Sequence, residues 1–575
     1  MRSALALVAL AACAAPTGQT VAPPPLAAVD PLLGWWDGDG DFGPAQAGTL
    51  VVHDAATGWT AALGDAAADL RPDGDGWRGA VGDGEVRLRR DGEGRLRGFW
   101  IQPGGLTLGQ RYATPVVLVR GGDGAHRGAV APVRDAIHVG MAVAWRDGRR
   151  VAWLREREKN LGSFLGDLAV EVAPDGTVTW RAADGTAVMT APPPVGDRLT
   201  VAFDGAPAPV VLVRRRPAGA RPAYRYAPPP VTDDGWPVAD AAAVGVDPAR
   251  LAAVVARIRA TTPTSVHAPA VHALVVARHG QLVLDEYFAG ADRDALHDLR
   301  SAGKTWSTTL LGIAIDRGLV ALGDRAFDRL GVATADPGHR AITLAHLASM
   351  SSGLDCDDHD RASPGNEDRM QAQRDQPDWY AYAAALPLVR APGSRGVYCT
   401  GALNLLGAVL GRATGQWLPD LFAAWLAEPL GITRYHLNLM PTGDGYLGGG
   451  LRLRARDFAK LPQLVLTGGV WAGRRVVSAA WLVAATAAHA SLSAPDDYGY
   501  GWWRRTLRVG GREVPVVFAS GNGGQLAIAA PTLDAVVVIQ AGNYGDFAVW
   551  QGFFDDVVVP VLAAIDATPP RSATP

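Results

Sequence analysis

The chain has 575 residues, of which 48% are hydrophobic and 19% are charged, the ordinary balance of a globular protein. One hydrophobic core does not serve a chain of this length, so two or three domains are expected. The formal net charge is -3 and the arginines are scattered, which gives no electrostatic basis for a nucleic-acid partner.

The first segment, residues 1–20, has the pattern of a secretory signal peptide. One arginine precedes an apolar run that ends in small residues and is too short to span a membrane. The end of this run, Leu10-Ala11-Ala12-Cys13, resembles a bacterial lipobox, in which the cysteine becomes the lipid-bearing first residue. The alternative is an ordinary signal with Cys13 discarded. We favour the lipoprotein and expect export to the periplasm or cell envelope, with a lipid on Cys13 as the one membrane link.

Residues 28–216 have the pattern of an antiparallel β domain. Alternating segments such as EVRLRR (85–90) and TVTWRAA (177–183) are separated by Asp-Gly turns. We expect an all-β meander that closes into a barrel or a sandwich. A filled interior is favoured, with Trp100, Trp153 and Trp180 as core residues. Binding of a ligand or an envelope component is the alternative role for this domain.

Residues 217–240 are proline-rich and lack periodicity, which predicts a linker. The pattern then changes over residues 241–566. A helix is predicted over residues 247–262, followed by a hairpin that turns at His279-Gly280. Helical patterns continue to about residue 490, before three strands and a last apolar helix. Strands at both ends predict an α/β domain with one antiparallel sheet packed by helices. Residues 567–575 read as a disordered tail.

Lysine is rare in this chain, with three lysines against 51 arginines. One of them, Lys304, follows Ser301 by three residues at the start of a predicted helix, so both side chains lie on one face. A serine hydroxyl needs a base, and a lysine whose pKa is lowered by burial can act as one, whereas arginine cannot. The pair alone is weak, because this composition gives an S-x-x-K by chance in about one sequence in twelve.

Four later segments follow SAGKTW (301–306) in a fixed order. They are ITLAHLASMSSGLD (342–355), APGSRGVYCTGALNLLGAVLGRATG (391–415), GYLGGGLRLRARDFAKL (445–461) and ASGNGGQLAIAAPTLDAVVVI (519–539). Together they resemble the serine β-lactamase and penicillin-binding-protein superfamily over about residues 243–566. The resemblance is greatest to its class C-related branch of serine hydrolases, esterases and 6-aminohexanoate-dimer-type amidases. It implies a multidomain chain whose C-terminal α/β domain, residues 241–566, is β-lactamase-like.

The resemblance also implies roles for individual residues. Ser301 is the acylated nucleophile, Lys304 the base or proton relay, and Tyr398 the second-motif tyrosine that passes the proton to the leaving group. The main-chain N–H groups of Ser301 and Gln525, the latter placed on an edge strand, hold the oxyanion. No cofactor and no metal is implied.

Two substrate-contacting motifs depart from the family pattern. The usual Tyr-x-Asn reads Tyr398-Cys399-Thr400, and the usual Lys-Thr-Gly or His-x-Gly reads Asn522-Gly523-Gly524. The second change removes a cation that would face a substrate carboxylate. We therefore expect a small-molecule or short-peptide ester or amide as substrate. The alternatives are a β-lactamase or D-alanyl-D-alanine carboxypeptidase, and a non-catalytic penicillin-recognising binding or sensor module.

Two other features lie close to the second motif. Cys356 and Cys399 can pair in an oxidising compartment, and two buried thiols are the alternative. The stretch LDCDDHDRASPGNEDR (354–369) is rich in acids, and a solvated loop near the active-site mouth is favoured over a metal site.

Overall fold

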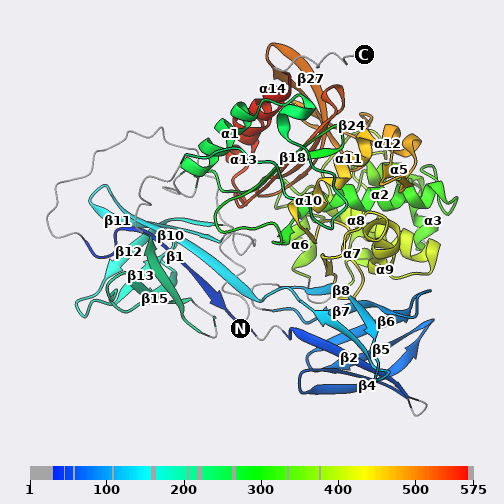
Figure 1. The fold of residues 1–575 in the computed structure, drawn as a ribbon, viewed down its shortest axis with the longest axis horizontal. Helices are drawn as coiled ribbons and strands as arrows, with labels where there is room; N and C mark the ends of the chain where they lie inside the picture. Colours follow the sequence, from blue (N-terminus) through cyan, green and yellow to red (C-terminus); the bar gives the residue numbers. More distant parts are fainter. Residues whose placement is uncertain are drawn as a thin grey trace.

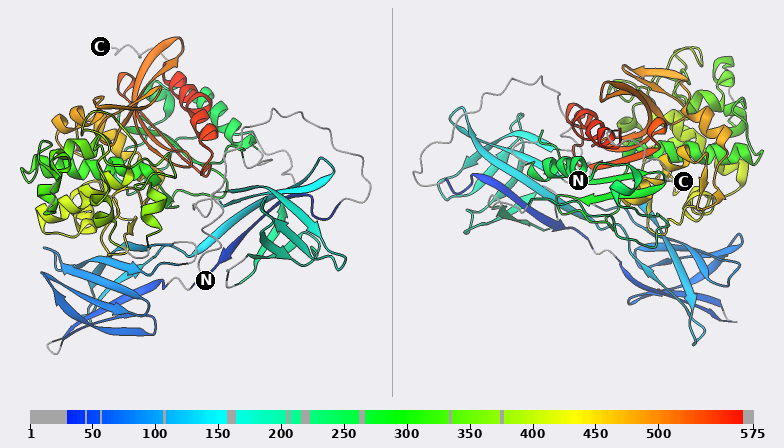
Figure 2. Two further views of the ribbon diagram at one scale, coloured as in Figure 1. Left: turned by 180° about the vertical axis from the view of Figure 1, so that it is seen from behind. Right: turned by 45° about the horizontal axis from the view of Figure 1, so that its top comes forward.

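The structure is a computed structural model of the chain. It describes residues 30–566 except for 44–45, 56–57, 106–108, 157–163, 204–205, 207, 216–222, 262–266, 333–335 and 374–376. The predicted signal peptide with Cys13 and the predicted C-terminal tail lie outside the described residues. The described chain forms two β-barrels beside one larger α/β body (Figures 1 and 2).

The first barrel is closed by strands that lie far apart in the sequence. Strand β1 (Gly34–Asp41) pairs with both β10 (Ala136–Arg146) and β16 (Val210–Arg215). The remaining strands of this barrel are β11 (Arg149–Glu156), β12 (Phe164–Val172), β13 (Val178–Arg181), β14 (Ala187–Ala191) and β15 (Arg198–Phe203). The eight strands between β1 and β10 are therefore an insertion into this barrel.

The inserted strands form the second barrel, which closes through pairing of β9 (His126–Val130) with β2 (Gly48–Ala55) and β8 (Arg111–Arg120). Its other strands are β3 (Gly58–Leu63), β4 (Ala66–Asp73), β5 (Gly76–Val81), β6 (Gly84–Arg90) and β7 (Leu96–Gln102). The predicted all-β character is confirmed. The single predicted meander is in fact two barrels, because turn signals report only neighbouring strands and not the pairing of β1 across the insertion.

Side chains fill both barrels. Trp36 and Trp180 lie in the core of the first barrel, and Trp100 lies in that of the second. Trp153 does not have the predicted core position. Its neighbours Ala152 and Leu154 point inward, so strand alternation turns Trp153 outward, where the guanidinium of Arg146 lies 5.0 Å from its ring.

The α/β body contains the predicted antiparallel sheet, assembled from both ends of residues 241–566. Its strand order is β18-β17-β29-β28-β27-β26-β25-β24. The strands are β17 (Val271–Arg278), β18 (Gln281–Tyr287), β24 (Ala490–Ser493), β25 (Asp496–Tyr498), β26 (Trp503–Val509), β27 (Arg512–Gly521), β28 (Gln525–Ala530) and β29 (Ala535–Ala541). The predicted hairpin turn at His279-Gly280 is confirmed, and both residues have positive φ (51° and 70°), as a tight two-residue hairpin turn requires.

Helices cover both faces of this sheet (Figure 1). One face packs against α1 (Pro248–Ala260), α13 (Phe547–Phe553) and α14 (Val559–Asp566), and the other against α2 (Gly303–Asp316) and α11 (Lys460–Leu466). Helix α8 (Thr400–Thr414) packs against α2. Successive residues of β17 belong to different cores: Ala273 and Val275 lie in the core that contains α2, whereas Leu274 and Val276 lie in the core that contains α14.

Shorter elements complete the body. They are η1 (Ala241–Val244), α3 (Ala326–Leu330), α4 (Pro337–Ala341), α5 (Leu344–Ala348), α6 (Glu367–Gln371), α7 (Trp379–Ala384), α9 (Leu418–Phe422), η3 (Ala423–Ala427), α10 (Ala455–Phe458), α12 (Ala479–Thr486), η4 (Pro531–Leu533), η5 (Phe554–Val558), β22 (Val470–Trp471) and β23 (Arg474–Arg475). In the described chain, one helical run, Phe547–Ile565, is long and apolar enough to cross a membrane. Val558, Val561 and Leu562 from this run pack on the sheet, so it serves as a core helix.

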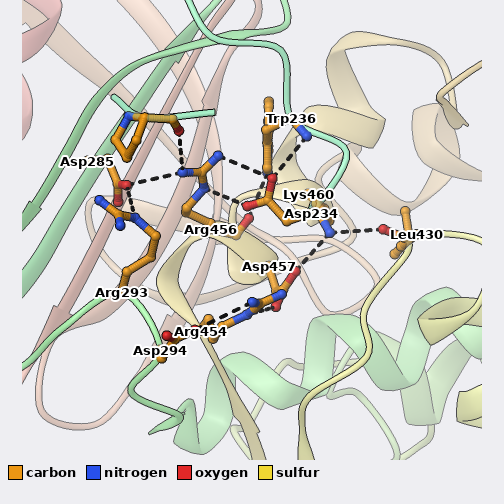
Figure 3. Close-up of polar contacts among 11 residues, drawn as sticks. Asp234, Trp236, Asp285, Arg293, Asp294, Leu430, Arg454, Arg456, Asp457 and Lys460 are labelled. Atoms are coloured by element: carbon orange, nitrogen blue, oxygen red, sulfur yellow. Dashed lines mark hydrogen bonds and ion pairs between the residues drawn. The ribbon is translucent and has the colours of Figure 1, made fainter. Parts of the chain in front are cut away.

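The described part of the predicted linker, residues 223–240, packs against the α/β body. Trp236 is buried, and its indole N–H donates to the main-chain O of Arg456 at 2.9 Å. Arg456 also contacts the carboxylates of Asp234 and Asp285 at 3.2 Å (Figure 3). These three charged side chains are at most 2% exposed, so the segment is fixed by a buried ionic cluster.

One sheet runs from the second barrel into the α/β body. Strand β8 pairs with β20 (His436–Leu439), which pairs with β21 (Leu451–Leu453) and through it with β19 (His297–Asp298). At the junction Thr114 Oγ1 lies 2.8 Å from His436 Nδ1, and burial lowers the pKa of His436 to about 3, which keeps its imidazole neutral. The barrel is therefore joined through β20 and β21 to β19, the strand that leads into Ser301.

Candidate active site

Ser301 and Lys304 lie together at the start of α2. Ser301 belongs to a single helical turn, η2 (Arg300–Ala302), that continues into α2. The Lys304 side chain is 1% exposed, and its Nζ donates to Ser301 Oγ at 2.9 Å and to Gly448 O at 2.5 Å. The three-residue spacing thus places an amine directly against the hydroxyl.

The surroundings of Lys304 favour its neutral form. Burial lowers the pKa of Lys304 from its ordinary value of 10.5, and the charges of Glu367 and Asp358 oppose this shift. A lysine with a lowered pKa supplies more free amine at neutral pH, which is what a base for Ser301 needs.

Tyr398 lies on the other side of this pair. Its phenol lies beside the Ser301 side chain, whose hydroxyl acts to lower the pKa of the phenol, and Lys304 Nζ lies 5.1 Å from the centre of its ring. Burial raises the pKa of Tyr398 well above its usual value, so the phenol stays protonated and can donate. The ring stacks on Trp503 at 5.9 Å and meets Tyr498 edge-on, which forms an aromatic wall.

The end of β27 lies directly against the turn that holds Ser301. A Cβ on Gly521 would lie 2.1 Å from Leu299 O and 3.1 Å from Ala302 N, so only glycine permits this approach. Likewise, a Cβ on Gly303 would lie 3.0 Å from Gly449 O. Gly521 directly precedes the Asn522-Gly523-Gly524 motif but was not among the predicted site residues.

The residues predicted to bind substrate have different surroundings. Asn522 Oδ1 accepts from Gly545 N–H at 2.8 Å, and Gly523 and Gly524 pack against the rings of Tyr544 and Phe553. Thr400 is buried at the start of α8. Thr400 and the glycine motif are close to Tyr398 and Gly521, respectively, through their adjacency in the chain.

Gln525 does not lie on an edge strand as predicted. The turn at residues 522–524 reverses the chain, so Gln525 begins β28, which lies between β27 and β29. Its side chain is fully buried and bonds the main chain of Ala541 through both amide atoms, at 2.6 and 3.3 Å. The side chain therefore fixes the sheet; the role of its N–H group in holding an oxyanion stays a prediction.

The structure joins Cys356 and Cys399 in a disulfide with a Cα–Cα distance of 5.4 Å. The bond links the acid-rich stretch to the residue that follows Tyr398. The sequence left open a disulfide or two buried thiols, and the structure has the disulfide.

Part of the acid-rich stretch points toward the interior, although the sequence predicted a solvated loop. Asp358 Oδ2 accepts from Thr400 N–H at 2.7 Å, and Glu367 Oε1 accepts from Tyr446 O–H at 2.6 Å. Asp357 and Asp360 instead cap main-chain N–H groups within the loop. Among the residues that the structure describes, no three His, Cys, Asp or Glu side chains are arranged to hold a metal ion.

Comparison with known proteins gives matches to one part of the chain. A family model described as Beta-lactamase matches residues 255–546. The chain is 27% identical over 314 residues to the 6-aminohexanoate-dimer hydrolase of Paenarthrobacter ureafaciens. The aligned region covers 51% of this chain and 79% of that protein. It is 33% identical over 178 residues to Esterase EstB of Burkholderia gladioli, covering 28% and 44% of the two chains, so it spans less than half of that esterase.

Solved structures give matches of similar extent. A putative 6-aminohexanoate-dimer hydrolase from Bacillus anthracis is 20% identical, with a TM-score of 0.43 over 50% of this chain and 79% of that one. A penicillin-binding protein homologue from Caulobacter crescentus is 20% identical, with a TM-score of 0.44 over 56% and 99% of the two chains.

Proposed function

Because this chain belongs to the Beta-lactamase family over residues 255–546, just over half of its length, we propose that it is a serine hydrolase that cleaves an ester or an amide through an acyl-enzyme on Ser301. Its curated relatives include an esterase and an amide hydrolase. The observation that carries the proposal is the 2.9 Å contact between Lys304 Nζ and Ser301 Oγ in a buried setting.

Acylation follows from the protonation states of the three side chains. Neutral Lys304 takes the proton from Ser301 Oγ as that oxygen attacks the carbonyl carbon. The main-chain N–H groups of Ser301 and Gln525 stabilise the oxyanion. Protonated Tyr398 then donates to the leaving oxygen or nitrogen and recovers a proton from the Lys304 ammonium. A water molecule then attacks the carbonyl carbon of the acyl-enzyme and gives up a proton to these side chains. Ser301 Oγ leaves and regains a proton, which releases the acid.

The substrate that fits best is a small molecule or short peptide whose ester or amide carries no required charge. Thr400 and Asn522 stand where the family has an amide and a cation, and neither carries a charge. The aromatic wall of Trp503, Tyr498 and Tyr398 favours an apolar or planar group beside the scissile bond. A β-lactamase, a D-alanyl-D-alanine carboxypeptidase and a non-catalytic sensor are the alternatives.

Export to the periplasm or cell envelope is part of this proposal, with a lipid on Cys13 as the anchor. The disulfide between Cys356 and Cys399 supports it, because such bonds persist in oxidising compartments. No nucleic-acid partner and no cofactor are included.

The experiment is intact-mass spectrometry after exposure to a fluorophosphonate serine probe, followed by turnover of 4-nitrophenyl esters and a chromogenic cephalosporin. We expect one adduct on the wild type, none on Ser301→Ala or Lys304→Ala, and faster turnover of the esters. Faster cephalosporin turnover would favour the β-lactamase. A stable adduct without turnover, or no adduct on folded protein, would favour the sensor.

A further inference from the structure

Asp358 contacts the segment from Tyr398 to Thr400 at both ends. Its N–H donates to Tyr398 O at 3.0 Å, and its Oδ2 accepts from Thr400 N–H at 2.7 Å. The disulfide ties Cys356 to Cys399 between these two bonds. A single residue of the acid-rich loop therefore fixes the main chain on both sides of Cys399, and with it the position of the Tyr398 phenol.

The carboxylate of Asp358 is itself held in place. Its Oδ1 accepts from Glu367 N–H at 2.9 Å, while Oδ2 is occupied by Thr400. The Glu367 side chain in turn accepts from Tyr446 O–H at 2.6 Å and from the Gln371 amide at 3.0 Å. Both carboxylates are thus anchored by hydrogen bonds from several elements, as positioning groups need to be.

The charges of Asp358 and Glu367 act on Lys304. The negative charges of Glu367 and Asp358 raise the pKa of Lys304, against the larger lowering by burial. Burial first, and then the Glu367 charge, raise the pKa of Asp358 to about 7. Tyr398, Tyr446, Asp368 and Arg300 also interact with one or both of these carboxylates, and His359 lies 5.9 Å from the Tyr398 ring.

We propose that Asp358 is a positioning residue for the reaction at Ser301: it holds the Tyr398–Thr400 segment through its main chain and its carboxylate, and with Glu367 it supplies the negative charge that faces Lys304. The inference rests on the proposed function. It assigns a role to a residue outside the serine, lysine and tyrosine that carry the chemistry.

The test compares Asp358→Asn with the wild type in ester hydrolysis from pH 5 to pH 10. Asparagine has the same shape but no charge and one acceptor oxygen, so it loses one of the two accepted bonds. We expect kcat to fall roughly tenfold through misplacement of Tyr398, with KM changed less than about twofold. Above about pH 7, where the Asp358 carboxylate is ionised, loss of its charge lowers the pKa of Lys304. The part of the rising limb that lies above this pH therefore shifts to lower pH by about half a unit or more.

Asp360→Asn is the matched control, because Asp360 is exposed in the same loop and its Oδ1 caps Ala362 N–H, which asparagine can also do. It should leave both kcat and the pH profile unchanged. Glu367→Gln removes the second charge and should shift the limb in the same direction, and it carries the test if Asp358→Asn does not fold.

The rate of fluorophosphonate labelling is followed over the same pH range, which separates two kinds of failure. A wild type that neither turns over esters nor is labelled would overturn the proposed function. If the wild type is active but Asp358→Asn changes neither kcat nor the position of the rising limb of the pH profile, this inference alone is overturned. Where only Glu367→Gln folds, the same result for that variant overturns it. An equal effect from Asp360→Asn would overturn it as well.

Discussion

Lys304 and Lys460 are buried in matching arrangements, and each donates to a side chain three residues earlier and to a distant main-chain carbonyl. For Lys304 these partners are Ser301 Oγ and Gly448 O, at 2.9 and 2.5 Å. For Lys460 they are Asp457 Oδ1 and Leu430 O, at 2.8 and 2.9 Å. The partner therefore decides the role: the carboxylate makes Lys460 half of an ion pair, whereas the hydroxyl of Ser301 leaves Lys304 without a bonded counter-ion.

Replacing Lys304 by arginine removes the base and puts a permanent positive charge in its place. We expect kcat/KM for a 4-nitrophenyl ester to fall by about 100-fold or more, because arginine cannot accept the serine proton. Circular dichroism of the variant confirms the fold before the kinetics are compared. Activity within a few-fold of the wild type would show that Lys304 is not the base.

The lowered pKa of Lys304 also predicts the pH dependence of the wild type. Activity requires the free amine, so kcat/KM should rise with pH as Lys304 loses its proton. Since burial lowers the pKa below 10.5, the midpoint of this rise should lie below that value. A pH–rate profile from pH 5 to pH 11 measures the midpoint; a rise centred at or above 10.5 contradicts the assignment.

The disulfide should stabilise the domain that contains it. Cys356 and Cys399 are 43 residues apart, and closing a loop of this length in the unfolded chain corresponds to about 4 kcal/mol by the chain-entropy model. The double variant Cys356→Ser, Cys399→Ser should therefore unfold at lower denaturant concentration, and lose activity because Cys399 follows Tyr398. Wild type treated with dithiothreitol should match it, and an unchanged midpoint for both samples would contradict the prediction.

The ionic cluster of Figure 3 predicts a large cost for removing its central residue. Arg456→Met leaves the buried carboxylate of Asp234 without this partner, which costs about 3–5 kcal/mol. Chemical denaturation of the full chain measures the loss. The control is Arg474→Met on the exposed strand β23, which should change stability by no more than about 0.5 kcal/mol.

A barrel residue should affect the hydrolase domain. Phe99 lies on β7 of the second barrel, yet its ring packs edge-on against Trp417 at 5.4 Å, within the core that also holds α2. Phe99→Ala should cost about 3–5 kcal/mol and lower the melting temperature of the α/β body along with that of the barrel. The partly exposed Trp59→Ala on the same barrel should leave the α/β body unchanged.

Local patterns in the sequence were enough to predict several elements of the fold and site. The hairpin at His279-Gly280, the sheet assembled from both ends of the domain and the approach of Lys304 to Ser301 all depend on residues a few positions apart, or on short apolar runs that mark buried strands. The pairing of β8 with β20 and the bond from Thr400 N–H to Asp358 depend on contacts between distant segments, which periodicity does not encode. Trp153 was misplaced because alternation fixes two faces but not which of them is inside.

The nesting of one barrel inside the other has a consequence for the order in which a nascent chain can complete its structure. Strand β1 leaves the ribosome first, but its partners β10 and β16 begin only at Ala136 and Val210. The inserted barrel, from β2 to β9, is complete by Val130 and can close while β1 is still unpaired. Strand β17 likewise cannot pair with β29 until residues 535–541 have been synthesised. The first barrel and the α/β body are therefore each completed only when their last strand, β16 or β29, is made, whereas the inserted barrel is completed earlier.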